Sequence, residues 1–218
     1  MDYAKKTLKI LKDLGAIITN SHFVYTSGKH GSVYIRKDML YTKTQKTSQI
    51  CKMIAKSVAN KKIEVVVGPA LGGIVLSQWT AYHLSKLTKK SVLSIFSEKG
   101  YEDKKIYNRP QILKRGYDKL VKNKRVLVVE DLTTTGASVK KVVEEVKSVG
   151  GKVACVYVLL NRNPKEVNSK FMGAPFASLS MMKADAWEEK DCPLCKKGVP
   201  INTEIAHGKE YLERKRKK

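Results

Sequence analysis

The sequence is poor in the residues that secreted, membrane-spanning or base-stacking proteins need. Of its 218 residues, 7% are aromatic and four are cysteine. No apolar run approaches the roughly 18 to 20 residues of a membrane-spanning helix. Four cysteines are too few for a disulfide framework, and no stretch alternates aromatics with arginine as a nucleic-acid stacking platform does. These absences predict a protein of a reducing compartment, the cytoplasm, with no membrane contact and no required nucleic acid.

Acidic residues are also scarce, because 20 Asp and Glu face 43 Lys and Arg, for a net charge of +23. The basic residues are spread along the chain, and only residues 214–218 form a dense run. Such a balance is typical of a solvated lysine-rich surface with a basic tail, of a protein with a phosphorylated ligand, or of one that binds nucleic acid. Charge alone leaves the three interpretations open.

Apolar periodicity predicts strands that alternate with helices. Continuous apolar runs such as Val65-Val66-Val67 are typical of strands buried on both faces of a parallel sheet. The pattern predicts an α/β fold, a central parallel sheet flanked by helices, with an N-terminal helix and hairpin as a hood. Residues 1–185 would form this domain and residues 186–218 a C-terminal appendage. The expected elements are helices over 2–14, 44–60, 73–87 and 139–146, a hairpin over 23–35, and strands over 65–67, 92–96, 126–129 and 153–160.

Two acids and a hydroxyl-rich turn follow the strand over 126–129. Glu130 and Asp131 can accept hydrogen bonds from vicinal hydroxyls or hold a divalent cation through water. The turn opens directly onto a helix, whose first N–H groups can enclose a phosphate, and its glycine lets the backbone approach closely. A helix cap explains one hydroxyl but not four in this stretch. The predicted phosphate-binding residues are Thr133, Thr134, Thr135, Gly136, Ala137 and Ser138.

This stretch, residues 126–138, resembles the phosphoribosyl pyrophosphate (PRPP) motif of the type I phosphoribosyltransferases. A second turn, Ala70, Leu71, Gly72 and Gly73, resembles the family's pyrophosphate loop. Within the family the orotate enzymes are most similar, through Phe23 and the Ser27-Gly28 step of residues 27–34. Phe23, Ser27 and Gly28 are therefore expected to bind the base.

The sequence also departs from the orotate enzymes. Many of them carry lysine where this chain has Thr26 and Gly72, and Lys29 is expected to take over one role at the pyrophosphate. The family's mobile loop corresponds to residues 97–117, which hold lysines and arginines but no histidine. Lys99 is the expected catalytic residue of that loop by position, beside Glu130 and Asp131.

The resemblance implies transfer of a phosphoribosyl group from PRPP to a nucleobase with release of pyrophosphate, dependent on Mg²⁺. Orotate is the favoured acceptor, which would make orotidine 5′-monophosphate for pyrimidine synthesis. A homodimer is implied by the family alone. Two alternatives stay open, a purine-base phosphoribosyltransferase and a PRPP-sensing regulator that binds nucleic acid.

Cys192 and Cys195 lie outside the region that the resemblance covers. A C-x-x-C pair is half of a tetrahedral zinc site, and a structural zinc is one interpretation. A tight turn with two packed thiols and a redox pair are the others. His207 is the nearest histidine and the expected third ligand; the fourth would be Cys51, Cys155, His22, His30, His83 or an acid.

Overall fold

The fold is built on a six-stranded sheet in the order β10-β9-β8-β5-β6-β7. The computed structural model describes residues 2–25, 27–100 and 110–216. All pairs in the sheet are parallel except β6 with β7, which is antiparallel. The expected parallel α/β sheet is thereby confirmed. Its strands are β5 (Val65–Pro69), β6 (Leu93–Lys99), β7 (Gln111–Ile112), β8 (Arg125–Thr133), β9 (Lys152–Asn161) and β10 (Phe176–Met181).

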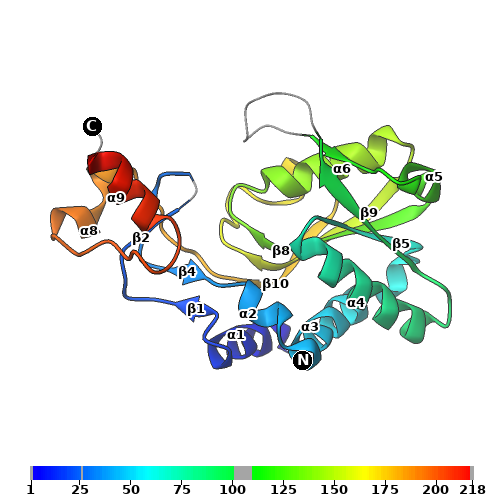
Figure 1. Cartoon of the computed structure of the whole chain (residues 1–218). Helices are drawn as coiled ribbons and strands as arrows, with labels where there is room; N and C mark the ends of the chain where they lie inside the picture. Colours follow the sequence, from blue (N-terminus) through cyan, green and yellow to red (C-terminus); the bar gives the residue numbers. More distant parts are fainter. Residues whose placement is uncertain (1, 26, 101–109, 217–218) are drawn as a thin grey trace.

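Helices cover both faces of the sheet, as Figure 1 shows. Alternate residues of the central strands enter two separate cores: Val66 and Leu127 face one, whereas Val65 and Val128 face the other. The first core lies against α1 (Tyr3–Asp13), α3 (Thr44–Val58) and α4 (Gly72–Thr88). The second lies against α5 (Tyr117–Val121), α6 (Ala137–Ser148) and α7 (Ser169–Met172). Burial on both faces explains the continuous apolar runs of these strands.

The N-terminal region contains two small ladders rather than one hairpin. Strand β2 (Phe23–Val24) pairs with β3 (His30–Gly31), and β1 (Ile17–Ile18) pairs with β4 (Tyr34–Ile35), both antiparallel. The expected hairpin over 23–35 is therefore correct in its first strand and wrong in its second. The run at 33–35 returns to β1 because Ile35 is buried in the first core, beside α1. A short helix, α2 (Asp38–Tyr41), follows, and η1 (Ala59–Lys61) extends α3.

The polar segment over 97–123 contains more structure than a loop. Strand β7 and helix α5 lie within it, and residues 101–109, which hold Lys104, Lys105 and Arg109, fall outside the described residues. Sequence periodicity also missed α7, which has only four residues, and β10, whose apolar residues are interrupted by Ser178 and Ser180. Within the described residues, no helix has the length and apolar character to cross a membrane.

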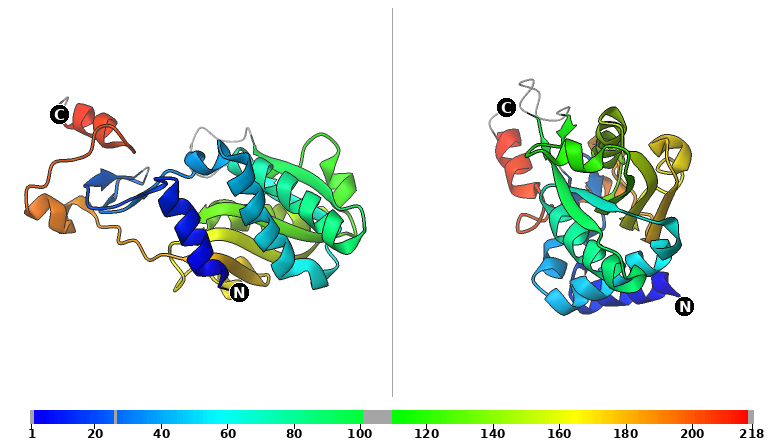
Figure 2. Two further views of the ribbon diagram at one scale, coloured as in Figure 1. Left: turned by 90° about the horizontal axis from the view of Figure 1, so that it is seen from below. Right: turned by 90° about the vertical axis from the view of Figure 1, so that its right-hand side faces the viewer.

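The C-terminal appendage lies beside the β2–β3 hairpin and away from the sheet (Figures 1 and 2). It consists of η2 (Glu189–Asp191), α8 (Pro193–Lys196), α9 (Gly208–Arg216) and connecting loops. Between residues 182 and 216 only Cys192 and Gly208 are buried. Backbone bonds attach it to the hairpin: the His30 and Trp187 N–H groups each donate to the other's carbonyl, both at 2.8 Å.

Candidate active site at the carboxyl edge of the sheet

The two acids lie inside strand β8, which runs four residues beyond its expected end at Val129. Glu130 is 8% exposed and Asp131 is 2% exposed. The Asp131 N–H donates to Glu130 Oε1 at 2.9 Å, and the Leu132 N–H donates to Asp131 Oδ1 at 2.6 Å. Both carboxyl groups are thus held by backbone donors at the edge where parallel α/β sheets bind ligands.

Asp131 also binds two side chains from the N-terminal region that sequence analysis did not identify. Lys37 Nζ lies 3.1 Å from Asp131 Oδ1 and 3.0 Å from Oδ2. The Tyr41 hydroxyl donates to Asp131 Oδ2 at 2.5 Å. Lys37 precedes α2 and Tyr41 ends it, so this short helix sets both groups against the strand. No motif marks them, because the contact spans about ninety residues of sequence.

Burial and mutual repulsion shape the titration of these groups. Burial first, and then the charge of Asp131, raise the pKa of Glu130 well above its usual range. Burial alone would lower the pKa of Lys37, but the charge and hydrogen bond of Asp131 outweigh it, so that pKa is raised. Burial and the same carboxylate raise the pKa of Tyr41. Lys37 therefore stays protonated and Tyr41 stays neutral, and both donate hydrogen bonds to Asp131.

The hydroxyl-rich turn connects β8 to α6, and its members divide into two groups. Thr133 is buried, and its hydroxyl donates to Asn161 Oδ1 at 3.1 Å, so it holds the turn in place. Gly136 has φ of +71°, and a Cβ there would lie 2.9 Å from Phe171 Cε1. Only glycine fits this position without strain. The remaining residues, Thr134, Thr135, Ala137 and Ser138, are exposed around the N-terminus of α6.

The second turn, residues 70–73, touches the acid pair. A Cβ on Gly72 would overlap the Asp131 carboxylate and lie 2.7 Å from the Tyr41 hydroxyl. Gly68 and Gly73 likewise approach so closely that a Cβ on Gly73 would lie 2.7 Å from the Gly68 carbonyl carbon. Leu71 is 83% exposed. The Ala70 N–H donates to the Ser97 carbonyl at 2.8 Å and is used within the fold.

The N-terminal residues expected at the base and the pyrophosphate point in different directions. Phe23 is fully buried, and its ring lies 5.5 Å from that of Tyr34. Ser27 and Gly28 are exposed in the turn between β2 and β3. Lys29 Nζ lies 3.2 Å from Glu188 Oε1, so this side chain faces the appendage.

Arg162, which also escaped sequence analysis, joins the phosphate turn to the hairpin. Its N–H donates to the Thr133 carbonyl at 2.8 Å. Its guanidinium lies 5.0 Å from the centre of the Tyr25 ring and donates to the Tyr25 hydroxyl at 3.2 Å. Lys99, the expected catalytic lysine, is exposed at the last position of β6 and is separated by Gly100 from residues 101–109, which fall outside the described residues.

The arrangement defines a class of protein: an α/β fold with a phosphate-binding turn and a buried acid pair at one sheet edge, which suits a phosphorylated sugar. The chain belongs to the phosphoribosyl transferase domain family, which matches residues 38–173. It is 34% identical to an orotate phosphoribosyltransferase of Caldanaerobacter subterraneus over 90% of this chain and 94% of the relative. It is 36% identical to that of Thermotoga maritima over 92% of this chain and 97% of the relative.

Solved structures show the same fold. The orotate phosphoribosyltransferase of Aeropyrum pernix superimposes with a TM-score of 0.60 at 24% identity, covering 80% of this chain and 93% of its own. The adenine phosphoribosyltransferase of Thermoanaerobacter pseudethanolicus superimposes with a TM-score of 0.62 at 19% identity, covering 80% and 99%. Enzymes for different bases thus share this architecture, and the fold does not identify the acceptor.

Proposed function

We propose that the chain transfers the phosphoribosyl group of PRPP to orotate, forming orotidine 5′-monophosphate and pyrophosphate. The observation that carries the proposal is the close approach of Gly72, in the second turn, to Asp131 of the acid pair. The strand that holds the acid pair leads directly into the exposed phosphate turn at the start of α6. Orotate is favoured because relatives of that name are 34 to 36% identical and match nearly the whole chain.

The reaction replaces one bond at the ribose C1. A nitrogen of the base supplies the electron pair of the new C–N bond, and the C1–O bond to pyrophosphate breaks with its electrons leaving on oxygen. The proton of that nitrogen passes to the departing pyrophosphate or to water. Glu130 and Asp131 would accept hydrogen bonds from the two ribose hydroxyls, and the amides at the start of α6 would bind the 5-phosphate. Holding both ends of the sugar sets C1 in line with the incoming base.

Magnesium fits the donors that this edge offers. Hard divalent cations prefer carboxylate oxygens and water, and Glu130 and Asp131 offer carboxyl oxygens at this edge. A bound cation would favour the ionised form of Glu130, against the burial that raises its pKa. These two acids would hold the ion, directly or through water. When bound, Mg²⁺ neutralises the pyrophosphate and makes it a better leaving group.

Lys37 would supply a further positive charge to the pyrophosphate. Many orotate enzymes have lysine in the second turn, where this chain has Gly72. A Cβ on Gly72 would meet Asp131 and Tyr41, so no side chain fits there without a shift. Lys37 reaches the same carboxylate from α2 and is 43% exposed, hence open to a ligand. That Lys29 and Lys99 also bind the pyrophosphate stays a prediction. Lys29 would first have to break its ion pair with Glu188.

The deciding experiment measures pyrophosphate release from PRPP with Mg²⁺ and one base at a time. Orotate, uracil, adenine, hypoxanthine and guanine would be compared at equal concentration, and the nucleotide product identified by mass. Release with orotate alone is the expected result. Release with a purine would make the chain a purine-base enzyme. If none of the bases supports release, and duplex DNA or RNA binds tightly with a steep salt dependence, the regulator would be supported.

Three broader expectations complete the proposal. The protein would act in the cytoplasm as a homodimer, and residues 1–185 would form the catalytic domain with 186–218 as an appendage. Sedimentation velocity at several protein concentrations tests the dimer. The appendage would be attached to the catalytic domain through its hairpin, because the backbone bonds of the appendage go to the hairpin rather than to the sheet.

A further inference from the structure

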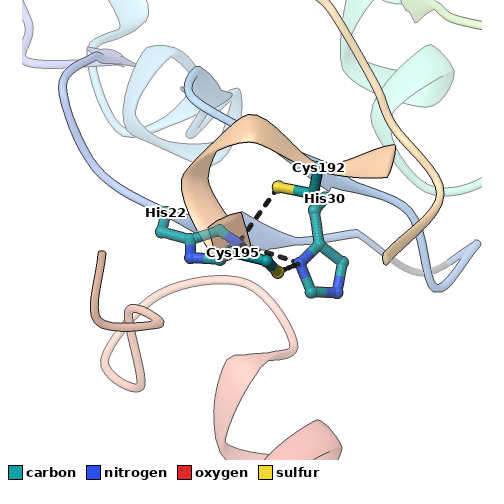
Figure 3. A group of neighbouring side chains, drawn as sticks. All are labelled: His22, His30, Cys192 and Cys195. Carbon is teal, nitrogen blue, oxygen red and sulfur yellow. Dashed lines mark hydrogen bonds between the residues drawn. The ribbon is translucent and has the colours of Figure 1, made fainter. Parts of the chain in front are cut away.

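Four side chains with metal-binding atoms converge between the hairpin and the appendage. His22 and His30 come from the β2–β3 hairpin, and Cys192 and Cys195 from the turn around α8 (Figure 3). Their ligand atoms all lie within 4.8 Å of one another. Both histidines and Cys192 are at most 1% exposed. The transfer reaction proposed above uses none of the four.

The distances suit a tetrahedral zinc ion. Zinc bonds of about 2.3 Å to sulfur and about 2.0 Å to nitrogen place tetrahedral ligands roughly 3.3 to 3.8 Å apart. Cys192 Sγ lies 3.6 Å and Cys195 Sγ 3.8 Å from His22 Nε2, and Cys195 Sγ lies 3.3 Å from His30 Nδ1. His22 Nε2 and His30 Nδ1 are 2.8 Å apart, so binding of an ion would increase the distance between them by about 0.5 Å.

The tautomer of His22 directs a lone pair into the cluster. His22 Nδ1 lies 2.8 Å from the Val199 carbonyl oxygen, which can only accept, so Nδ1 carries the proton. The other ring nitrogen, Nε2, therefore presents its lone pair to the cysteines and to His30. A ligating histidine whose second nitrogen donates to a backbone carbonyl is the usual arrangement around zinc.

Hydrogen bonds alone do not satisfy the cluster: among the described residues, His30 Nε2 is buried without a hydrogen-bond partner. His30 Nδ1, Cys192 Sγ and Cys195 Sγ all lie within hydrogen-bond reach of His22 Nε2. A single lone pair cannot accept from three groups, and buried donors without acceptors are costly. A cation removes the conflict because two thiolates and two neutral imidazoles all donate electron pairs to it, with release of the two thiol protons.

The appendage needs such a cross-link because it has no apolar core of its own. Cys192 and Gly208 are its buried residues between 182 and 216. The ligand histidines are themselves joined to it by backbone bonds: Asn202 N–H donates to the His22 carbonyl at 2.8 Å, and His30 pairs with Trp187. Small units with little buried surface commonly depend on a metal for folding.

We propose that His22, His30, Cys192 and Cys195 bind one structural Zn²⁺ that fastens the C-terminal appendage to the N-terminal hairpin. Four protein ligands leave no open position for substrate, which is the mark of a structural rather than a catalytic zinc. The site corrects the expectation that His207 is the third ligand, because both histidines come from the hairpin. Distance along the chain was the wrong guide, since the fold brings residues 22 and 195 together.

Metal content is the direct test. Tag-free full-length protein, purified without chelator and dialysed, should contain about one zinc per chain by elemental analysis. The Cys192→Ser/Cys195→Ser variant should contain none. His207→Ala and Cys155→Ala are the matched controls, a histidine of the appendage and a cysteine of the sheet, and both should keep the metal. Zinc absent from the wild type, or equal zinc in the double variant, would overturn the proposal.

Two measurements on the wild-type protein cover the case in which the double variant does not fold. Replacement of zinc by Co²⁺ should give the visible absorption of tetrahedral, thiolate-bound cobalt, and added Zn²⁺ should abolish it. A mercurial that blocks thiols should release one zinc per chain to a chromogenic chelator. If Co²⁺ gave no thiolate absorption and the mercurial released no zinc, the proposed site would be wrong. A Cys192–Cys195 disulfide in protein purified from a reducing cytoplasm would also contradict it. Pyrophosphate release is scored separately, so failure of the proposed function is distinguishable.

Discussion

The acid pair on β8 and the histidine–cysteine cluster are both buried polar groups, but their surroundings differ. Glu130 and Asp131 continue a strand whose preceding residues, Val128 and Val129, are fully buried in the two cores. The cluster lies between a two-residue-strand hairpin and an appendage with almost no buried apolar surface. Where apolar burial already stabilises the fold, buried charge is available for chemistry. Where it does not, the polar groups themselves must hold the structure.

Asp131→Asn tests the first half of this comparison and should have the largest effect. The substitution keeps the side-chain volume but removes the charge that faces the ribose and pairs with Lys37. We expect turnover to fall by about 100-fold or more, with an unchanged circular dichroism spectrum. Glu130→Gln should act likewise at alkaline pH, where Glu130 is ionised despite its raised pKa. Asp13→Asn, at an exposed acid of α1, is the control. Near-normal turnover in both site variants would remove the acid pair from the mechanism.

Gly72→Ala should distinguish damage to the site from damage to the fold. The added Cβ would displace the Asp131 carboxylate or the Tyr41 hydroxyl, and misplacement of this kind commonly lowers kcat/KM by about tenfold or more. Gly15→Ala is the matched control, because Gly15 has φ of +61° and open space around it. It should cost about 1 kcal/mol of unfolding free energy and leave kcat/KM unchanged. Equal kcat/KM in the two variants would contradict the assigned contact.

Removal of zinc tests the second half of the comparison, in which polar groups hold the structure of the appendage. A strong chelator should expose the appendage to trypsin at Lys190, Lys196 and Lys197, while the main thermal transition of the sheet stays near its original temperature. Because the hairpin carries the residues expected at the base, KM for orotate should rise several-fold more than kcat falls. Readdition of Zn²⁺ should restore both readouts. Loss of the main transition on chelation would show that the two regions are not independent.

The sheet could be predicted from sequence far better than either polar site. Runs such as Val65-Val66-Val67 report a strand buried on both faces whatever surrounds them. The turn at 133–138 was identified because helix start, glycine and hydroxyls are adjacent in sequence. Lys37, Tyr41 and Arg162 left no such signal, since each reaches the site from another element.

The histidine–cysteine cluster likewise combines residues that the sequence pattern marks with residues that it does not. Cys192 and Cys195 were recognisable as half of a metal site by their spacing. His22 and His30 stood only among several possible partners, because a hairpin of two-residue strands leaves almost no periodic pattern. Short strands also explain why the pairing of residues 33–35 with β1 was missed. The expected end of β8 came four residues early for a different reason, because the apolar run stops at the first charged side chain.

Tyr25→Phe should have the smallest effect, because it weakens a single side-chain connection between the hairpin and the phosphate turn. The Tyr25 hydroxyl donates to the Val33 carbonyl at 2.5 Å and accepts from the guanidinium group of Arg162. The backbone N–H of Arg162 donates to the Thr133 carbonyl in the phosphate turn. Removing the hydroxyl should cost about 1 kcal/mol of unfolding free energy.

The link between the regions is measured by a double-mutant cycle with Arg162→Met, which keeps an unbranched side chain but removes the guanidinium group and its charge. If Arg162 acts on the hairpin through Tyr25, the effects of the two substitutions on KM for orotate should be less than additive. The change in kcat from Tyr25→Phe should be smaller than the change in KM, because the hydroxyl does not contact the acid pair. If the effects of the two substitutions on KM were fully additive, Arg162 would not act through Tyr25. The phosphate turn and the hairpin would then bind their parts of the substrates independently.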